Sequence, residues 1–126
     1  MAAPSEPATA AASAAATASL DDLLRLDVRV GTVVRAEPFP EARKPAYRLW
    51  VDLGPGHGVR RSSAQVVARY APADLVGRQV LAVANLPPRR VAGFESEVLV
   101  LGVPDAEGAV VLLRPDAPVP DGGRMY

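Results

Sequence analysis

The segment 85–102 combines cationic, hydroxyl and amide side chains with residues that stiffen a loop. Two prolines precede Arg89 and Arg90, and Phe94 and Ser96 come just before an apolar run. Guanidinium groups donate several hydrogen bonds in a fixed geometry, which suits carboxylates, phosphates and peptide carbonyls. Polar side chains held on a rigid loop beside a strand commonly form a binding site. We therefore expect binding chemistry at this loop.

A second cationic pair, Arg43 and Lys44, lies in the segment 38–45, which contains three prolines. Proline fixes the local chain direction and removes backbone donors, so this segment cannot continue a strand. We expect both cationic pairs to converge at one end of the fold. The alternative is ordinary loop charge surrounded by solvent.

Other polar residues leave more than one interpretation open. Ser62, Ser63 and Gln65 lie where a strand is expected to give way to a helix, so either serine could cap that helix or offer its hydroxyl to a ligand. The cap is the preferred interpretation. Asn85 can bind a ligand or close its strand into a turn, and Trp50 can pack at an interface or provide a stacking platform.

Residues for catalysis or metal binding are sparse. The chain has no cysteine and one histidine, His57, which lies between glycines. This excludes disulfides and thiolate metal sites, and makes a structural zinc site improbable. There is no nucleophile elbow, Walker-type phosphate loop or His-Glu helix motif. We expect no enzyme, no metal and no cofactor.

Charge is unevenly distributed along a chain whose formal net charge is zero. Residues 35–90 hold ten Lys and Arg against four acids, a net charge of +6, whereas 1–34 hold two against four and 91–126 two against six. A local basic surface can therefore exist on a neutral protein, and a polyanion could use it. Dispersed and neutralised basic side chains remain the equally open alternative.

The 126 residues fit one domain, and ten alanines fall within the first 20. We interpret 1–18 as a flexible Ala-rich tail and 19–126 as the folded domain. The tail lacks the basic start and strongly apolar stretch of a secretory signal, and no window is apolar enough to span a membrane. A cytoplasmic location is expected.

Alternating residues predict strands at 27–37 and 47–53. Further short strands are expected at 59–63, 79–84, 98–101 and 110–113. Gly31 suggests a bend or bulge in the first strand, and the Gly-rich turn at 54–58 joins the second and third as a hairpin.

Two helices are expected. Ser19 followed by Asp22, with leucines on one face, predicts a short capped helix at 19–24. The segment 64–75, broken near Pro72, is the best candidate for a second helix. Short strands with one inserted helix match an all-β fold, a small OB barrel plus a short N-terminal helix. A sandwich is the alternative.

The strands 98–101 and 110–113 are apolar on both faces, whereas the outer face of a lone barrel is largely polar. Either the leucine-rich first helix or a second copy of the chain covers them. We favour a homodimer in which both contribute.

Five segments, 27–34, 39–46, 62–65, 85–88 and 93–102, carry a joint pattern of motifs. Together they resemble the tRNA-binding OB domain superfamily and, within it, the small free-standing CsaA-type export chaperones. The resemblance covers about 23–126. In tRNA-binding relatives the loop reads Asn-Leu-Lys-Pro, Gly and then Ser-x-Gly-Met; here Pro87 replaces the lysine, and Val98 and Leu99 replace the Gly-Met pair. A lost loop cation weakens phosphate attraction, and Arg89 and Arg90 can restore it.

The resemblance implies a homodimer that binds unfolded polypeptides or exported preproteins without nucleotide and contacts the translocation motor protein. The alternative it implies is a structure-specific tRNA binder that uses the same surface. The residues predicted to bind peptide or RNA are Arg43, Lys44, Ser62, Ser63, Gln65, Asn85, Pro87, Arg89, Arg90, Phe94 and Ser96.

Overall fold

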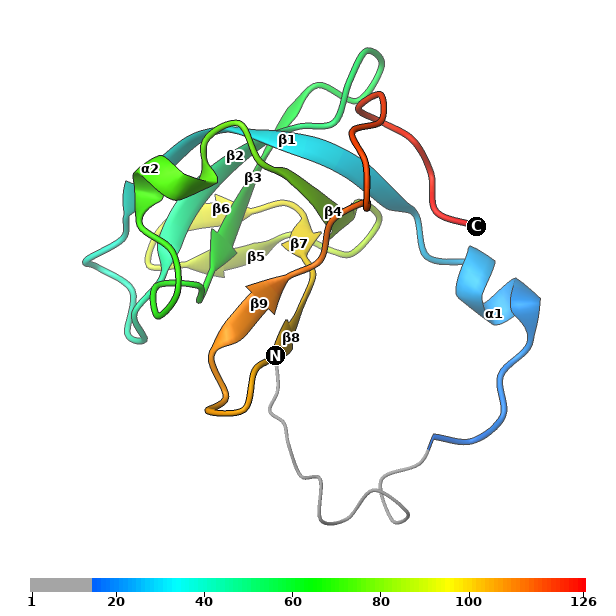
Figure 1. The fold of residues 1–126 in the computed structure, drawn as a ribbon, viewed down its shortest axis with the longest axis horizontal. Helices are drawn as coiled ribbons and strands as arrows, with labels where there is room; N and C mark the ends of the chain where they lie inside the picture. Colours follow the sequence, from blue (N-terminus) through cyan, green and yellow to red (C-terminus); the bar gives the residue numbers. More distant parts are fainter. Residues whose placement is uncertain (1–14) are drawn as a thin grey trace.

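The computed structural model describes residues 15–126, in which short strands predominate (Figure 1). The elements are α1 (Leu20–Leu24), β1 (Val28–Pro38), β2 (Tyr47–Asp52), β3 (Val59–Ala64), α2 (Pro72–Leu75), β4 (Gln79–Val83), β5 (Arg89–Val91), β6 (Phe94–Ser96), β7 (Leu99–Val100), β8 (Gly102–Pro104) and β9 (Val110–Leu112). Most of the tail predicted at 1–18 lies outside the described residues, and 15–18 are exposed without helix or strand.

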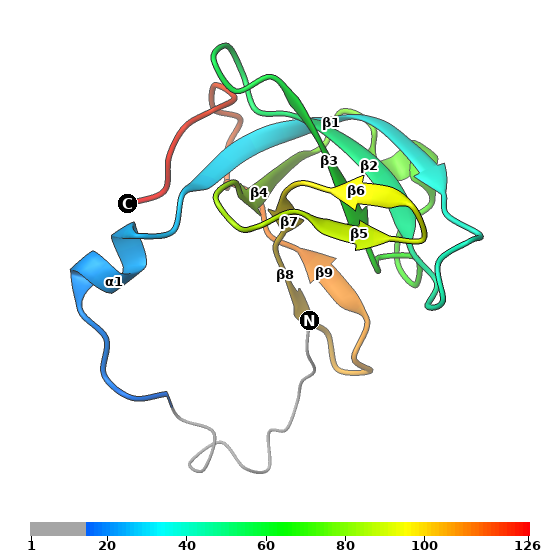
Figure 2. The same cartoon turned by 180° about the vertical axis from the view of Figure 1, so that it is seen from behind.

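Five strands form one antiparallel sheet in the order β3-β2-β1-β4-β7, and this sheet curls into a barrel (Figures 1 and 2). The two ends meet where the carbonyl oxygen of Arg61 on β3 accepts hydrogen bonds from the backbone N–H groups of Glu97 and Val98, at 2.8 and 3.2 Å. The barrel is therefore nearly closed, with α2 between the third and fourth strands. The predicted all-β OB-fold barrel is confirmed.

Alternate residues of the strands fill the barrel. Val33, Leu49, Val51 and Val80 are fully buried, and Leu75 of α2 joins them. This alternation follows from the two-residue period of a strand, and it leaves the opposite side chains of β2 and β3 on the outer surface. Ser63 of β3 is one of these outward-facing residues.

The bulge in β1 lies after Gly31, the residue at which the sequence suggested it. The pairing with β2 shifts register between Val33 and Arg35, which marks a bulge. Gly31 instead lies where the two strands approach closely, because a Cβ there would come within 2.6 Å of Cγ1 of Val51. Only glycine allows this approach without displacement.

The helix predicted at 64–75 is wrong for most of its length. Ala64 is the last residue of β3, and the helix is confined to Pro72–Leu75. Ala71 is extended, with ψ 158°, because the residue before a proline disfavours helical geometry. Tyr70 is held in place by tertiary contacts: its carbonyl oxygen accepts from the hydroxyl of Tyr47 at 2.6 Å, and its own hydroxyl accepts from the Leu112 N–H at 3.0 Å.

Two corrections concern the segment 89–104. The loop expected before the apolar strand contains the β5–β6 hairpin, which turns at Ala92 and Gly93 with φ of 46° and 83°. The strand predicted at 98–101 is confined to β7, which pairs with β4, and a separate strand, β8, follows it and pairs with β9. The chain changes partner at Leu101, between these two short strands.

The N-terminal helix forms with the predicted cap. The Ser19 hydroxyl accepts from the Asp22 N–H at 3.1 Å, and the Asp22 carboxylate accepts from the Ser19 N–H at 3.0 Å. Helix α1 buries none of its residues and lies apart from β8 and β9 in both views (Figures 1 and 2). It does not cover the apolar strands within one chain. No helix in residues 15–126 has the length and apolarity needed to cross a membrane.

Candidate functional site

An open cavity of about 660 Å³ lies between the loop after β1 and the β5–β6 hairpin. Its lining residues are Ala42, Arg43, Lys44, Ala46, Ser63, Gln65, Arg89, Arg90, Val91 and Ala92. The structure thus brings six of the predicted site residues together at one place. Ala42, Ala46, Val91 and Ala92 were not among the predicted site residues, because small apolar side chains carry no distinct sequence signal for binding.

The first wall of the cavity is fixed by backbone hydrogen bonds and by a buried ring. Phe39 is almost fully buried, its N–H donates to the carbonyl of Ala46 at 3.2 Å, and its carbonyl accepts from the Ala42 N–H at 3.2 Å. These bonds close the loop after β1 into a compact turn. Arg43 and Lys44 are therefore carried on an anchored loop, as its prolines indicate.

The second wall is the β5–β6 hairpin, which packs against the first. The ring of Phe94 meets those of Phe39 and Trp50 edge-on, with centroids 5.5 and 5.8 Å apart. Residues Phe39, Trp50 and Phe94 form what we call the aromatic cluster. Because Phe39 follows β1 and Phe94 belongs to the hairpin, the aromatic cluster joins the two walls, and none of its members lines the cavity.

Arginines cover the aromatic cluster. The Arg35 guanidinium lies 4.4 Å from the centroid of the Trp50 ring, and Arg48 and Arg61 lie 5.2 and 5.5 Å from those of Phe39 and Phe94. Trp50 is therefore in contact with Arg35 and Phe94 within the chain. This arrangement favours a packing role over the stacking platform considered for Trp50.

The floor of the cavity is the end of β3. Gln65 follows this strand, and the Ser63 hydroxyl makes no hydrogen bond to another described residue. The Ser63 N–H donates to Oγ of Ser96 at 3.0 Å. No helix begins here, so the helix-capping role predicted for Ser62 or Ser63 is wrong.

The cavity is strongly cationic. It is lined by four basic side chains and no acidic one. Within residues 15–126, Arg43, Lys44 and Arg89 have no ion-pair partner, and Arg90 has only a 3.6 Å contact with Glu95, in which the two side chains are 69% and 43% exposed. Such an exposed contact contributes little free energy. The arrangement suits an anion, or carbonyl groups that accept from guanidinium donors.

Five predicted site residues lie outside the cavity lining: Ser62, Asn85, Pro87, Phe94 and Ser96. Ser62 is fully buried, with its hydroxyl directed to the carbonyl of Ser63 at 3.4 Å. Ser96 is also buried and serves as the acceptor for the Ser63 N–H described above. Pro87 is exposed on the segment between β4 and β5.

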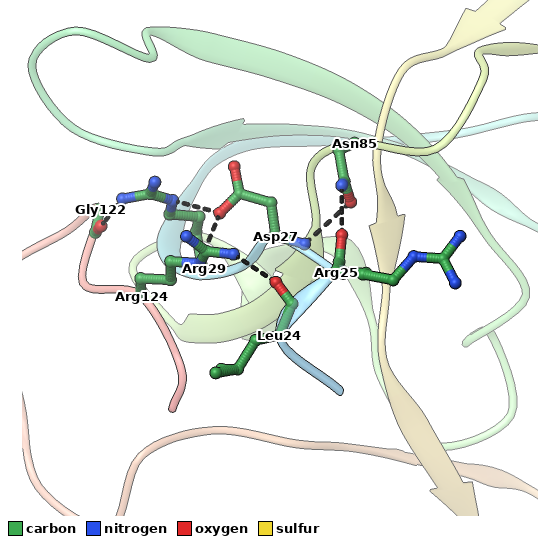
Figure 3. A network of polar contacts seen from close by, with 7 residues as sticks. All are labelled: Leu24, Arg25, Asp27, Arg29, Asn85, Gly122 and Arg124. Atoms are coloured by element: carbon green, nitrogen blue, oxygen red, sulfur yellow. Dashed lines mark hydrogen bonds and ion pairs between the residues drawn. The ribbon is translucent and has the colours of Figure 1, made fainter. Parts of the chain in front are cut away.

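Asn85 belongs to a polar network that ties α1 to the barrel (Figure 3). Its Oδ1 accepts from the Asp27 N–H and its Nδ2 donates to the carbonyl of Arg25, both at 2.8 Å. Arg124 continues the network by donating to the carbonyl of Leu24 at 2.7 Å. Both ends of the Asn85 amide are thus engaged within the chain, which favours the structural alternative.

Comparison with known proteins gives this architecture a family. Residues 28–124 match the family model described as "Putative tRNA binding domain". The chain belongs to the tRNA-binding domain family. The resemblance inferred from the sequence motifs is therefore confirmed, and it covers β1 through the C-terminal segment.

Among solved structures, this tRNA-binding domain is similar to the crystal structure of the chaperone CsaA from Bacillus anthracis strain Ames. The identity is 55% over 88% of this chain and 100% of that chain, with a TM-score of 0.81. The CsaA chaperone protein from Picrophilus torridus is 38% identical over 87% of this chain and 100% of its own, also with a TM-score of 0.81. The resemblance to the CsaA type thus extends over nearly the whole fold.

The curated relatives of this tRNA-binding domain are longer proteins. The methionine–tRNA ligase of Porphyromonas gingivalis strain ATCC 33277 is 41% identical over 107 residues, which make up 85% of this chain and 15% of the ligase. The chain spans about 15% of the length of such relatives. It therefore matches a small part of the ligase, and the ligase's activity is not carried over.

Proposed function

We propose that this protein is a homodimeric, non-catalytic chaperone of the CsaA type, which binds unfolded polypeptides, including preproteins for export, in the cytoplasm and without nucleotide. The observation that supports this most directly is the composition of the cavity between the loop after β1 and the hairpin. The lining combines four basic side chains with small apolar side chains, those of Ala42, Ala46, Val91 and Ala92. The similarity to CsaA over all of that chain supports the same function.

An extended polypeptide offers what this lining can bind. Its carbonyl oxygens accept hydrogen bonds from guanidinium groups, and its small apolar side chains fit against alanines and valine. Two cavities in a dimer would hold two segments of one unfolded chain and so raise the apparent affinity. Holding the unfolded state in this way suppresses aggregation by mass action.

The test is the binding of a permanently unfolded, reduced and alkylated model protein, followed by fluorescence anisotropy. We expect Arg43→Gln combined with Arg89→Gln to weaken binding by roughly tenfold, because each lost guanidinium removes charge-assisted hydrogen bonds. The matched control is Arg69→Gln combined with Arg114→Gln, which removes the same charge outside the cavity. The control is expected to bind within about twofold of the unaltered protein.

Thermal unfolding of each variant establishes that loss of binding is not loss of fold. If the unaltered protein neither binds the unfolded chain nor suppresses its aggregation, the chaperone proposal is wrong. Equal weakening by both double variants would mean that overall charge, and not this cavity, is responsible.

A second candidate function is structure-specific tRNA binding, which the family membership and the unpaired cations support. With four phosphate contacts, raising the salt concentration from 50 to 150 mM is expected to weaken binding of labelled bulk tRNA by roughly 20- to 50-fold. Arg89→Glu combined with Arg90→Glu is expected to abolish it. A flat salt response would rule out this function.

A further inference from the structure

The basic side chains of this protein differ in their ion-pair partners. Outside the cavity, six arginines form ion pairs within the chain: Arg29, Arg35, Arg48, Arg61, Arg69 and Arg124. Inside it, among residues 15–126, only Arg90 has an acidic partner, at 3.6 Å and largely exposed. Four further arginines outside the cavity, Arg25, Arg60, Arg78 and Arg114, also lack an ion pair among residues 15–126. The cavity differs from these single positions because it gathers four basic side chains at one place with no acidic side chain in its lining.

The absence of acidic side chains from the cavity lining does not result from a shortage of acids nearby. Glu41 precedes Arg43 by two residues and is exposed, yet it is absent from the lining and forms no ion pair with a described residue. Glu97 pairs with Arg61 through a 3.5 Å contact and accepts from the Arg61 N–H at 2.9 Å. The neighbouring acids are thus directed elsewhere, and the repulsion among the four cavity cations is left for a ligand to relieve.

The lining also limits the kind of ligand. Single-stranded nucleic acid is held by aromatic side chains on which bases stack. No aromatic residue lines this cavity, and the aromatic cluster is engaged with itself and with three arginines. Small apolar side chains between cations instead suit a polypeptide segment that carries both carboxylates and small side chains.

We propose that the cavity selects acidic segments, those in which Asp or Glu lies among small apolar residues, from unfolded polypeptides. The inference rests on the proposed chaperone function and adds a substrate class to it. The Arg89 and Arg90 guanidinium groups bind ligand carboxylates from the hairpin wall, and Arg43 and Lys44 do so from the opposite wall. Segments rich in Lys or Arg are rejected, because they would add charge of the same sign to an uncompensated site.

The test uses three decapeptides of identical Ala, Val and Ser sequence that differ at two positions, which carry Glu, Gln or Lys. Acetylated and amidated ends remove the terminal charges, and isothermal titration calorimetry avoids a charged dye. At 50 mM salt we expect the Glu peptide to bind roughly five- to tenfold more tightly than the Gln peptide, and the Lys peptide to bind most weakly. At 1 M salt the Debye length is only about 3 Å, so charge attraction is screened and the difference in affinity between the Glu and Gln peptides is expected to disappear.

Variants separate charge selection from general binding. Arg43→Gln combined with Arg89→Gln is expected to reduce the Glu-to-Gln preference to within about twofold, and Arg69→Gln combined with Arg114→Gln to retain it. Equal binding of the Glu and Gln peptides overturns the acidic preference and leaves the chaperone proposal standing. If no peptide and no unfolded protein binds, whereas bulk tRNA binds with steep salt dependence, both are overturned in favour of RNA.

Discussion

At the scale of single residues, Ser96 and Ser63 have opposite roles although one hydrogen bond joins them. Oγ of Ser96 is buried and accepts from the Ser63 N–H at 3.0 Å, which links β6 to β3 where the barrel closes. The hydroxyl of Ser63 lies on the cavity side of β3. Ser96 therefore acts in stability, whereas Ser63 is available to a ligand.

Ser96→Ala is expected to lower the free energy of unfolding by about 1–2 kcal/mol, because the Ser63 N–H loses its acceptor in a partly buried place. Urea denaturation measures this as a lower midpoint with an unchanged slope. Ser63→Ala is the matched control, and its unfolding free energy is expected to change by less than about 0.5 kcal/mol. Unchanged stability of Ser96→Ala together with lost polypeptide binding would contradict this assignment and make Ser96 a ligand contact.

At the scale of elements, local signals predicted some structures well. The helix α1 followed from Ser19 and Asp22, since a capping box is satisfied within four residues. Strands β1 and β2 followed from alternation over six or more residues. The segment 64–75 failed because the contacts that decide it are distant: the Tyr47 hydroxyl and the Leu112 N–H hold Tyr70 in place, and Val66 packs into the core.

The β5–β6 hairpin escaped sequence interpretation for a related reason. Its turn is Ala92-Gly93, and alanine at a positive φ gives a weaker signal than the Asn-Gly or Asp-Gly pairs that mark such turns. Three-residue strands are also too short for a period to be recognised. The sequence placed both cationic pairs on stiff loops, and the structure brings them into one cavity. The contact between Phe94 and Phe39, which joins the two walls, could not be predicted from the sequence, because the two residues are far apart in the chain.

At the scale of the whole molecule, the apolar surface of α1 is held away from the barrel. Leu20 and Leu23 of α1, and Leu26 just after it, are 67%, 42% and 41% exposed. The network of Asn85 and Arg124 nevertheless anchors this segment through the carbonyls of Arg25 and Leu24 (Figure 3). A five-residue helix has little stability of its own in water. In the proposed homodimer, a second copy of the chain covers this anchored, exposed leucine face.

Leu20→Ser combined with Leu23→Ser is accordingly expected to convert a dimer to a monomer at micromolar concentration, since burial of each leucine contributes about 1.5–3 kcal/mol and both copies lose two. Sedimentation equilibrium measures the change. The control is Val59→Ser, at the exposed first residue of β3. The unaltered protein sedimenting as a monomer at tens of micromolar would contradict the dimer.

Because each copy carries a whole cavity, the monomeric variant is expected to bind a short acidic peptide as tightly as before but a long unfolded chain at least about tenfold more weakly. Loss of short-peptide binding as well would mean that the cavity needs the partner copy.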